Sequence, residues 1–361
     1  MGCKGMSAGS GTVALFAGWV LAILPAFTQD YPQVGKGVSL QFPRDHGSHP
    51  QFRNEWWYVT GRLEAEGREF GMQITFFRNR PRVAEDSPSR FAPRQLLFAH
   101  AALSIPDSGR YLSDQRAARA GFGLAEAAEG ETDVVIEDWS LKAVGAGYAA
   151  EVSARDFRYA LRFEARQPPL LQGERGFSRK GPQPAQASYY YSLPHLAVKG
   201  SLFVQGRELQ ASGEAWLDHE WSSEPLAEGA AGWDWVGINL ADGGALMAFR
   251  IRGKDGSTLW AGGALRGADG RLRNLQPAEV RFTAIRRWRS SRSGAEYPVG
   301  LRVEAGGVTL ELDPLMDDQE LDARASTGTI YWEGAVRARQ GDKTAGRGYL
   351  ELTGYWKALR L

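Results

Sequence analysis

The sequence has almost no cysteine. Cys3 is the only cysteine in 361 residues, and it lies before an apolar run with the layout of a secretory signal, so we expect the mature chain to contain none. No disulfide can then stabilise the fold. Stability must come from the burial of apolar side chains and from the closure of sheet edges.

Long hydrophobic runs are also scarce. The apolar run at residues 13–24 is too short to span a bilayer comfortably. One charge before it, Lys4, and small residues after it indicate a signal peptide over residues 1–28, cleaved near Thr28. We therefore expect an extracytoplasmic protein, periplasmic or secreted, that meets a membrane only peripherally. The alternative is an N-terminal anchor that is kept. Because Cys3 precedes the apolar run, it is not placed as a lipoprotein acceptor.

No charge of one sign dominates, and familiar catalytic motifs are missing. Lys and Arg total 43 against 42 Asp and Glu, which argues against nucleic acid as a partner. No Walker loop, Rossmann fingerprint or serine nucleophile elbow is present. His46 and His49 are three residues apart, but they lie in a loop without an HExxH helix or a cysteine partner. We expect no metal and no cofactor.

Several segments of the sequence have the periodicity of β-strands. Apolar residues occupy every second position in residues 157–165, which predicts a strand with one buried and one wet face. Residues 299–303 and 308–312 alternate in the same way around Gly306 and Gly307, the pattern of a hairpin. Helical composition is confined to Ser113–Glu129, and glycines weaken it there. The fold class is predicted to be all-β, with antiparallel barrels because closure removes sheet edges.

The strands repeat along the chain. The segment NEWWYVTGRL (Asn54–Leu63) is echoed by GWDWVGINL (Gly232–Leu240), and each leads into a strand that ends on arginine, Arg78 or Arg250. Two copies of one strand pair indicate two copies of one domain. We expect matching places on the opening strands for Trp56 or Trp57 and for Trp233 or Trp235.

The repeat also sets the expected boundaries. The first domain should cover residues 33–223 and the second residues 229–361, with a connector in Glu224–Ala230. Both should be rich in aromatic side chains, since the chain has 12 Trp, 12 Tyr and 16 Phe. Such residues suit either a β-core or a pocket for an apolar ligand.

Three segments carry a family resemblance: Phe42–Gly61 (FPRDHGSHPQFRNEWWYVTG), Ser212–Trp221 (SGEAWLDHEW) and Gly232–Arg252 (GWDWVGINLADGGALMAFRIR). They resemble the AttH/CrtC family of lipocalin-like proteins, which includes carotenoid 1,2-hydratases. The resemblance implies two tandem lipocalin-like, calycin-type barrels with an apolar cavity. It does not imply one activity, because members share the fold but not the chemistry.

A hydratase needs a strong proton donor, a surface that stabilises a carbocation, and water. A buried carboxyl can donate the proton, and aromatic faces can stabilise the cation. Asp218, His219, Glu220 and Trp221 supply these types within four residues. On a strand, however, His219 and Trp221 share one face while Asp218 and Glu220 share the other. One strand therefore cannot aim all four into a single cavity.

If His219 and Trp221 face the cavity, the acid must come from another segment. The candidates are Asp45, Glu55 and Asp234. The catalytic set predicted from sequence comprises Asp218, His219, Trp221 and Asp234, and the ligand-binding set comprises His49, Glu55, Trp57, Tyr58, Trp233 and Trp235. Each has a structural alternative: the Asp218–Trp221 cluster could tie the two domains together, and Glu55 with its neighbouring tryptophans could plug the floor of a barrel.

The resemblance also contains a departure. It implies that the family's hydratases place a Tyr and an Asp on the strand that here reads ALMAFRIR (Ala245–Arg252), whereas this strand is apolar until Arg250. We therefore favour an exported protein that binds an apolar, isoprenoid or lipid-like small molecule, with components of an ABC-type transporter as expected partners. The alternative is a hydro-lyase similar to carotenoid 1,2-hydratase. A purely structural or adhesive module is the third possibility.

Overall fold

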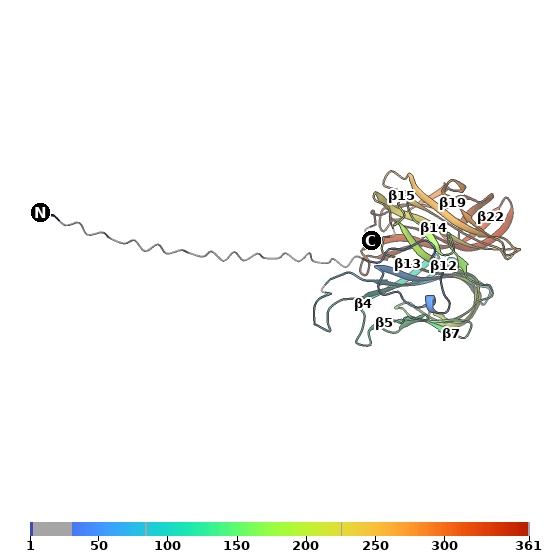
Figure 1. The fold of residues 1–361 in the computed structure, drawn as a ribbon. Coiled ribbons are helices and arrows are strands. Elements are labelled where there is room, and N and C mark those ends of the chain that lie inside the picture. The colour runs from blue at the N-terminus through green and yellow to red at the C-terminus, as the bar shows by residue number, and fades with distance from the viewer. Residues whose placement is uncertain (3–30, 84, 225, 360–361) are drawn as a thin grey trace. The chain divides into compact units, whose positions relative to one another are not determined.

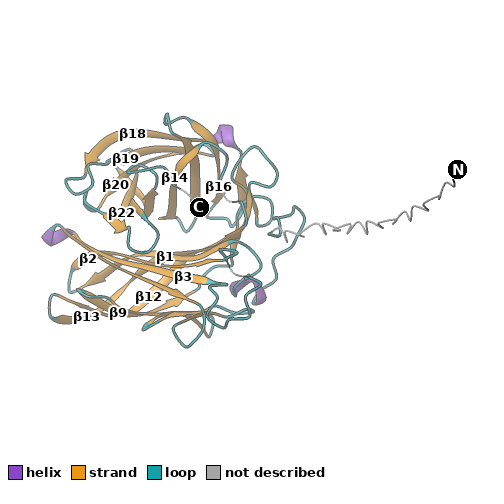
Figure 2. Cartoon of the chain, turned by 90° about the vertical axis from the view of Figure 1, so that its left-hand side faces the viewer, coloured by secondary structure: helices purple, strands orange, loops and turns teal. Residues whose placement is uncertain are grey.

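The structure is a computed structural model that describes residues 1–2, 31–83, 85–224 and 226–359. In these residues the regular structure is antiparallel β-strand, apart from three short 3-10 helices, η1 (Arg44–His46), η2 (Pro106–Ser108) and η3 (Pro277–Glu279) (Figure 1, Figure 2). The all-β prediction is confirmed. The strands form two sheets, and each sheet is built from one half of the chain.

The first sheet has the strand order β4-β3-β2-β1-β13-β12-β9-β8-β7-β6-β5, with β10 and β11 also paired to β12. Its strands are β1 (Asn54–Ala65), β2 (Arg68–Asn79), β3 (Leu96–Ile105), β4 (Arg110–Arg119), β5 (Ala125–Ala127), β6 (Asp133–Ile136), β7 (Trp139–Val144), β8 (Gly147–Ser153), β9 (Phe157–Glu164), β10 (Leu170–Leu171), β11 (Phe177–Arg179), β12 (Ala187–Val204) and β13 (Arg207–Ser222).

The second sheet has the order β17-β16-β15-β14-β23-β22-β20-β19-β18, with β21 paired to β22. Its strands are β14 (Ala230–Leu240), β15 (Ala245–Gly253), β16 (Thr258–Arg266), β17 (Leu272–Leu275), β18 (Val280–Arg289), β19 (Glu296–Ala305), β20 (Val308–Pro314), β21 (Glu320–Ala323), β22 (Thr329–Gln340) and β23 (Lys343–Leu352).

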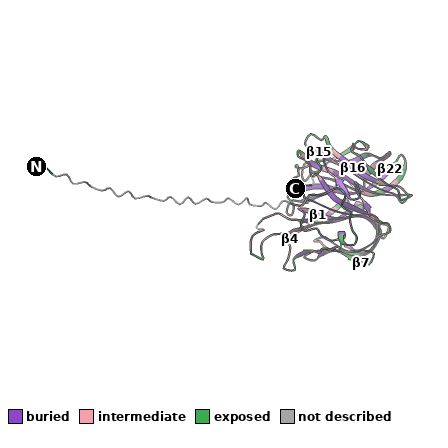
Figure 3. Ribbon diagram, in the orientation of Figure 1, coloured by how far each residue is buried: buried purple, intermediate pink, exposed green. Residues whose placement is uncertain are grey.

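Both sheets curl around a core of their own. In the first sheet β3 and β4 come back beside β6, and in the second β15 and β16 come back beside β18. Strand β9 alternates buried and exposed residues along its whole length, as the period of two predicted. The buried residues follow the strands of both sheets (Figure 3). This arrangement is that of two lipocalin-like antiparallel units in tandem.

The pairing registers show the repeat directly. In the first sheet Glu55 on β1 lies opposite Arg78 on β2, and in the second Asp234 on β14 lies opposite Arg250 on β15. Each acid is followed by a tryptophan, Trp56 or Trp235, which lies opposite a glutamate on the last strand of its sheet. These glutamates are Glu220 and Glu351. The matching places predicted for the tryptophans are therefore occupied by Trp56 and Trp235.

One local prediction is wrong. Ser113–Glu129 has helical composition, but residues up to Arg119 form β4 and Ala125–Ala127 form β5. Strand β4 pairs with β3 over its full length. Those ladder hydrogen bonds outweigh an intrinsic helix preference that amounts to only a few tenths of a kcal/mol per residue.

The first sheet ends at Ser222 and the second begins at Ala230, so the interval between them overlaps the predicted connector Glu224–Ala230. Residues 31–361 nevertheless form one compact unit. The domain bounds 33–223 and 229–361 stay a prediction about folding units.

The expected signal peptide, residues 1–28, lies outside the described residues apart from Met1 and Gly2. Within the described residues, no helix is both long and apolar enough to cross a membrane. Export stays a prediction: we expect sequencing of the mature N-terminus to find cleavage near Thr28. Recovery of the chain from the cytosol with Met1 intact would contradict it.

Candidate functional site

The predicted site residues of strand β13 lie on its two opposite faces. Trp221 packs in the core of the first sheet, together with Leu217. Trp216, two positions before Asp218, packs instead against residues of the second sheet. The period of two thus separates His219 and Trp221 from Asp218, as predicted from sequence. Two polar clusters result, one inside the first sheet and one between the sheets.

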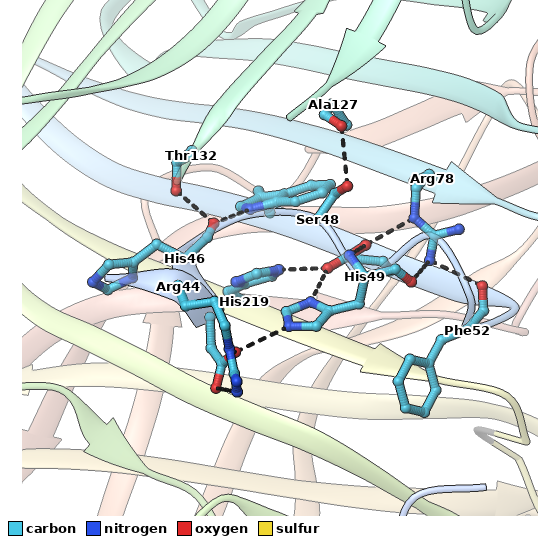
Figure 4. Close-up of polar contacts among 12 residues, drawn as sticks. Arg44, His46, Ser48, His49, Phe52, Arg78, Ala127, Thr132 and His219 are labelled. Carbon is cyan, nitrogen blue, oxygen red and sulfur yellow. Dashed lines mark hydrogen bonds and ion pairs between the residues drawn. The ribbon is translucent and has the colours of Figure 1, made fainter. Parts of the chain in front are cut away.

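The first cluster centres on the Glu55 carboxylate, at the end of the first sheet covered by η1 (Figure 4). One oxygen, Oε1, lies 2.7 Å from His49 Nδ1 and 2.9 Å from His219 Nε2. The other, Oε2, accepts from Arg78 Nε and from the His49 backbone N–H, each at 2.8 Å. Beyond these, His49 Nε2 lies 3.5 Å from Asp45 Oδ1. The Glu55 carboxylate therefore has its hydrogen-bonding capacity filled.

Aromatic rings hold the two imidazoles in place. His49 stacks on Trp221 with ring centroids 3.7 Å apart, and His219 stacks on Trp57 at 4.7 Å. Trp57 Nε1 donates to the His46 carbonyl, which ties the covering loop to the sheet. With Glu55, five predicted residues from three segments thus meet in one place.

The charges in this cluster follow from its contacts. Burial would raise the pKa of Glu55, but hydrogen bonds from His219 and His49 and the charge of Arg78 outweigh it and hold that pKa well below its ordinary value. Burial lowers the pKa of His219, which is therefore neutral. Burial also lowers the pKa of His46, to about 4. The pKa of His49 is raised, because its bonds to Asp45 and Glu55 outweigh its burial.

Asp234 does not join this cluster. It lies at the matching end of the second sheet, fully buried, where Arg250 Nε donates to it at 2.7 Å and Arg252 Nε at 2.8 Å. Tyr355 adds a third hydrogen bond at 3.0 Å. The second copy thus keeps the acid and the arginine of the repeat but surrounds them with a second arginine instead of imidazoles.

The second cluster lies between the sheets. Asp218 accepts hydrogen bonds from the Tyr190 hydroxyl and the Ser192 hydroxyl, both at 2.5 Å, and from Trp216 Nε1 at 2.6 Å. Trp235, from the second sheet, donates to the Tyr190 hydroxyl at 3.0 Å. Burial raises the pKa of Asp218 to about 7, although these three bonds oppose the rise.

Two further carboxyls lie on the second sheet, and one of them, Glu351, is close enough to Asp218 for their charges to interact. Glu333 on β22 and Glu351 on β23 lie directly opposite each other. Glu351 accepts a hydrogen bond from Trp233 Nε1 at 2.8 Å. Both oxygens of Glu333 are buried and have no hydrogen-bond partner among the described residues, and the same is true of the hydroxyls of Tyr58 and Tyr349. Four buried polar atoms are thus left without partners in the same region.

The pKa values of this pair are shifted upward. Burial raises the pKa of Glu333 well above its ordinary value and the neighbouring Glu351 raises it further, although the hydroxyls of Tyr58 and Tyr331 beside it oppose the rise. Burial likewise raises the pKa of Glu351, and Asp218 and Glu220 add to the effect. The burial of Glu333 and the repulsion between two carboxyls on directly opposite positions both favour retention of a proton by the pair.

A groove that opens to solvent reaches Trp216, which packs between the sheets. It has a volume of ≈ 350 Å³. Trp216 lines it, next to Gly237 of the second sheet. A Cβ added at Gly237 would lie 2.6 Å from the Trp235 ring, so glycine is required there for the tryptophans to pack. Trp216 thus lines the groove and also donates a hydrogen bond to Asp218.

The comparisons with known proteins agree with this architecture. The family model for AttH-like proteins matches residues 33–355. The chain belongs to the AttH-like family. No curated protein matches it.

Three solved structures share the fold of this chain. A candidate AttH protein from Nitrosomonas europaea is 52% identical, with 90% of this chain and 99% of that chain covered and a TM-score of 0.84. Kievitone hydratase from Nectria haematococca is 15% identical, with 91% and 95% covered and a TM-score of 0.67. CghA with Sch210972 is 12% identical, with 84% and 89% covered and a TM-score of 0.51. At such low identity the last two show the fold alone.

Sequence reasoning brought some of this AttH-like site together and missed the rest. It named Asp218, Tyr58 and Trp235, and the structure places all three between the sheets. It missed Glu333 and Glu351. An alignment of the two repeats could have found Glu351, because it takes the place that Glu220 takes in the first copy. No motif marks Glu333, a single acid within an apolar strand.

The raised pKa of Asp218 predicts a pH dependence of stability. Its carboxyl ionises near pH 3.8 in the unfolded chain and near pH 7 in the folded chain, so its contribution is complete below pH 3.8 and is lost as pH rises toward 7. We expect the free energy of unfolding of the wild type, relative to Asp218→Asn, to fall by a few kcal/mol between about pH 4 and pH 7. Urea denaturation at several pH values measures this. A difference that does not change with pH would contradict it.

Proposed function

We propose that this AttH-like protein is a hydro-lyase that adds water to a carbon–carbon double bond of an apolar substrate bound between the two sheets. The observation that carries the proposal is the Glu333 carboxyl. It is fully buried, it has a raised pKa, and neither of its oxygens has a partner among the described residues. A buried acid with a raised pKa retains its proton to higher pH than an exposed one, and it can donate that proton to a bound substrate.

The surroundings of Glu333 suit the chemistry that follows. Protonation of one alkene carbon by Glu333 breaks the acid's O–H bond, forms a C–H bond and leaves a carbocation on the neighbouring carbon. The rings of Tyr58 and Trp235, whose centroids lie 5.3 Å apart, offer faces that stabilise a positive charge. Water then forms a C–O bond to the cation, and its proton passes to the carboxylate that Glu333 has become. The acid is thereby restored.

Three further features support an apolar substrate. Met247, Phe249 and Ile251 of β15 pack with the tryptophans in an apolar cluster between the sheets. The groove lined by Trp216 opens to solvent at this cluster. The fold is shared with kievitone hydratase, whose name states that it adds or removes water. The apolar character of β15, which the resemblance presents as a departure from the hydratase pattern, is here part of the binding surface, and the acid comes from β22.

The test is a product assay with the full chain. Purified protein is incubated in D₂O with an acyclic isoprenoid or carotenoid alkene. We expect a tertiary alcohol that carries one deuterium on the adjacent carbon, because the donated proton exchanges with solvent before transfer. Protein denatured by heat serves as the control.

A different result would favour the exported binding protein. That function is supported by the apolar surface between the sheets and by the predicted signal peptide. If the alkene co-purifies with the protein and is released unchanged, without deuterium and without alcohol, the hydro-lyase proposal is overturned. Transfer of the ligand to transporter components would then be the next step to examine.

A further inference from the structure

The imidazoles at the covered end of the first sheet are not used by the proposed reaction. His49, Glu55 and His219 each direct one potential ligand atom toward a common point, and these three atoms all lie within 4.8 Å of one another. We infer that the three residues form a binding site for a divalent transition-metal ion of the zinc class. The site is separate from Glu333 and from the proposed chemistry, since it lies on the opposite face of β1 and β13.

The ligand types match those of known zinc sites. Two imidazole nitrogens and one carboxylate oxygen form the set His₂Glu, which zinc uses where a fourth position stays open. Glu55 Oε1 lies 2.7 Å from His49 Nδ1 and 2.9 Å from His219 Nε2. Zinc bonds of about 2.0–2.2 Å in tetrahedral geometry place ligand atoms about 3.3 Å apart. The two distances from Glu55 Oε1 to the imidazole nitrogens must therefore each lengthen by roughly half an ångström. His49 lies on a loop, which can supply this movement.

The other polar atoms of the three ligands already have partners. His49 Nε2 faces Asp45 Oδ1 at 3.5 Å, and His219 Nδ1 faces the Tyr191 hydroxyl at 3.2 Å. When these outer nitrogens carry the ring protons, the inner nitrogens present lone pairs to the common point. Glu55 Oε2 is held by Arg78, which leaves Oε1 for the ion. A histidine whose second nitrogen is held by a carboxylate or hydroxyl is the usual arrangement around bound metals.

The protein also offers an access path and an electrostatic balance. The His49 side chain is 13% exposed, whereas the side chains of Glu55 and His219 are fully buried. An ion can therefore reach the site past His49. The carboxylates of Glu55 and Asp45 offset part of its charge, and Arg78 contacts the oxygen that faces away from it.

The second copy of the repeat shows that the imidazoles are not needed to close a sheet of this kind. At the matching end, Asp234 is held by Arg250 and Arg252. Guanidinium groups have no lone pair to give to a metal. At the end of the second sheet two ion pairs and the Tyr355 hydroxyl hold Asp234 without any imidazole, which provides a natural control within the same chain.

The test uses the metal alone as the probe. Untagged full chain carrying Cys3→Ser, which removes the only thiol, is treated with a chelator, dialysed and titrated with Co²⁺ and then Zn²⁺. We expect one equivalent of Co²⁺ per chain, a visible absorption band of a low-coordinate site that Zn²⁺ abolishes, and a rise in Tm with metal concentration.

Variants locate the binding. His49→Gln, Glu55→Gln and His219→Gln should each lower the affinity at least 100-fold, and Asp45→Asn about 10- to 100-fold. Asp234→Asn, the matched control, should leave it unchanged. His49→Gln alters a loop side chain and keeps the proposal testable if the buried variants fail to fold. Absence of stoichiometric binding between pH 6 and pH 8, or binding that survives His49→Gln, would overturn the site. Because metal content is the readout, the result does not depend on whether the protein is a hydro-lyase.

Discussion

Replacement of Glu333 by glutamine is expected to lower kcat for hydration by roughly 10²–10⁴-fold, the usual contribution of a general acid. KM should change little, since a proton donor acts mainly in the transition state. Glutamine resembles the protonated, neutral form of Glu333 in size and charge. The variant should therefore fold, with a Tm close to that of the wild type, and steady-state kinetics on the alkene measures the effect.

The matched control for this variant is Glu320→Gln. Glu320 is also a buried glutamate, and it lies on β21, opposite Trp332 of the strand that carries Glu333. Its carboxylate is held by Ser290 and Ser293, outside the space between the sheets. Its replacement should leave kcat within about twofold of the wild type. Equal activity of the Glu333→Gln variant and the wild type would remove Glu333 from the mechanism.

Replacement of Arg78 by methionine is expected to lower the free energy of unfolding by about 3–5 kcal/mol, the cost of removing one partner from a buried ion pair. Arg78 is 2% exposed. It donates to Glu55, to Gln95 and to the backbone carbonyls of His49 and Phe52. Methionine fills a similar volume but leaves the Glu55 charge without its arginine. Chemical denaturation measures the loss.

The control for Arg78→Met is Arg302→Met on the second sheet. Arg302 donates to Glu311 at 2.8 Å, but the side chains of this pair are 47% and 44% exposed. An exposed pair of this kind contributes about 0–1 kcal/mol. If both variants lose a similar free energy of unfolding, the buried pair does not stabilise the first sheet more than an exposed pair stabilises the second.

The sequence by itself determined the fold class, the repeat and the division of β13. Alternation of apolar and polar residues has a period of two only in a strand, so it was enough to predict β9 and the hairpin between β19 and β20. It also separated Asp218 from His219, because neighbouring residues of a strand point to opposite faces. Local patterns of this kind depend only on residues that are close together in the sequence.

Only the tertiary structure decided which side chains meet. Glu55 and His219 are 164 positions apart, and the pairing of β1 with β13 brings them to 2.9 Å. Glu333 is a second case that could not be predicted from the sequence. Nothing in its neighbourhood distinguishes it from a surface glutamate, and its burial, raised pKa and unpaired oxygens arise only because the first sheet covers β22. Desolvation depends on what packs above a residue, and that is a property of the assembled sheets rather than of any segment.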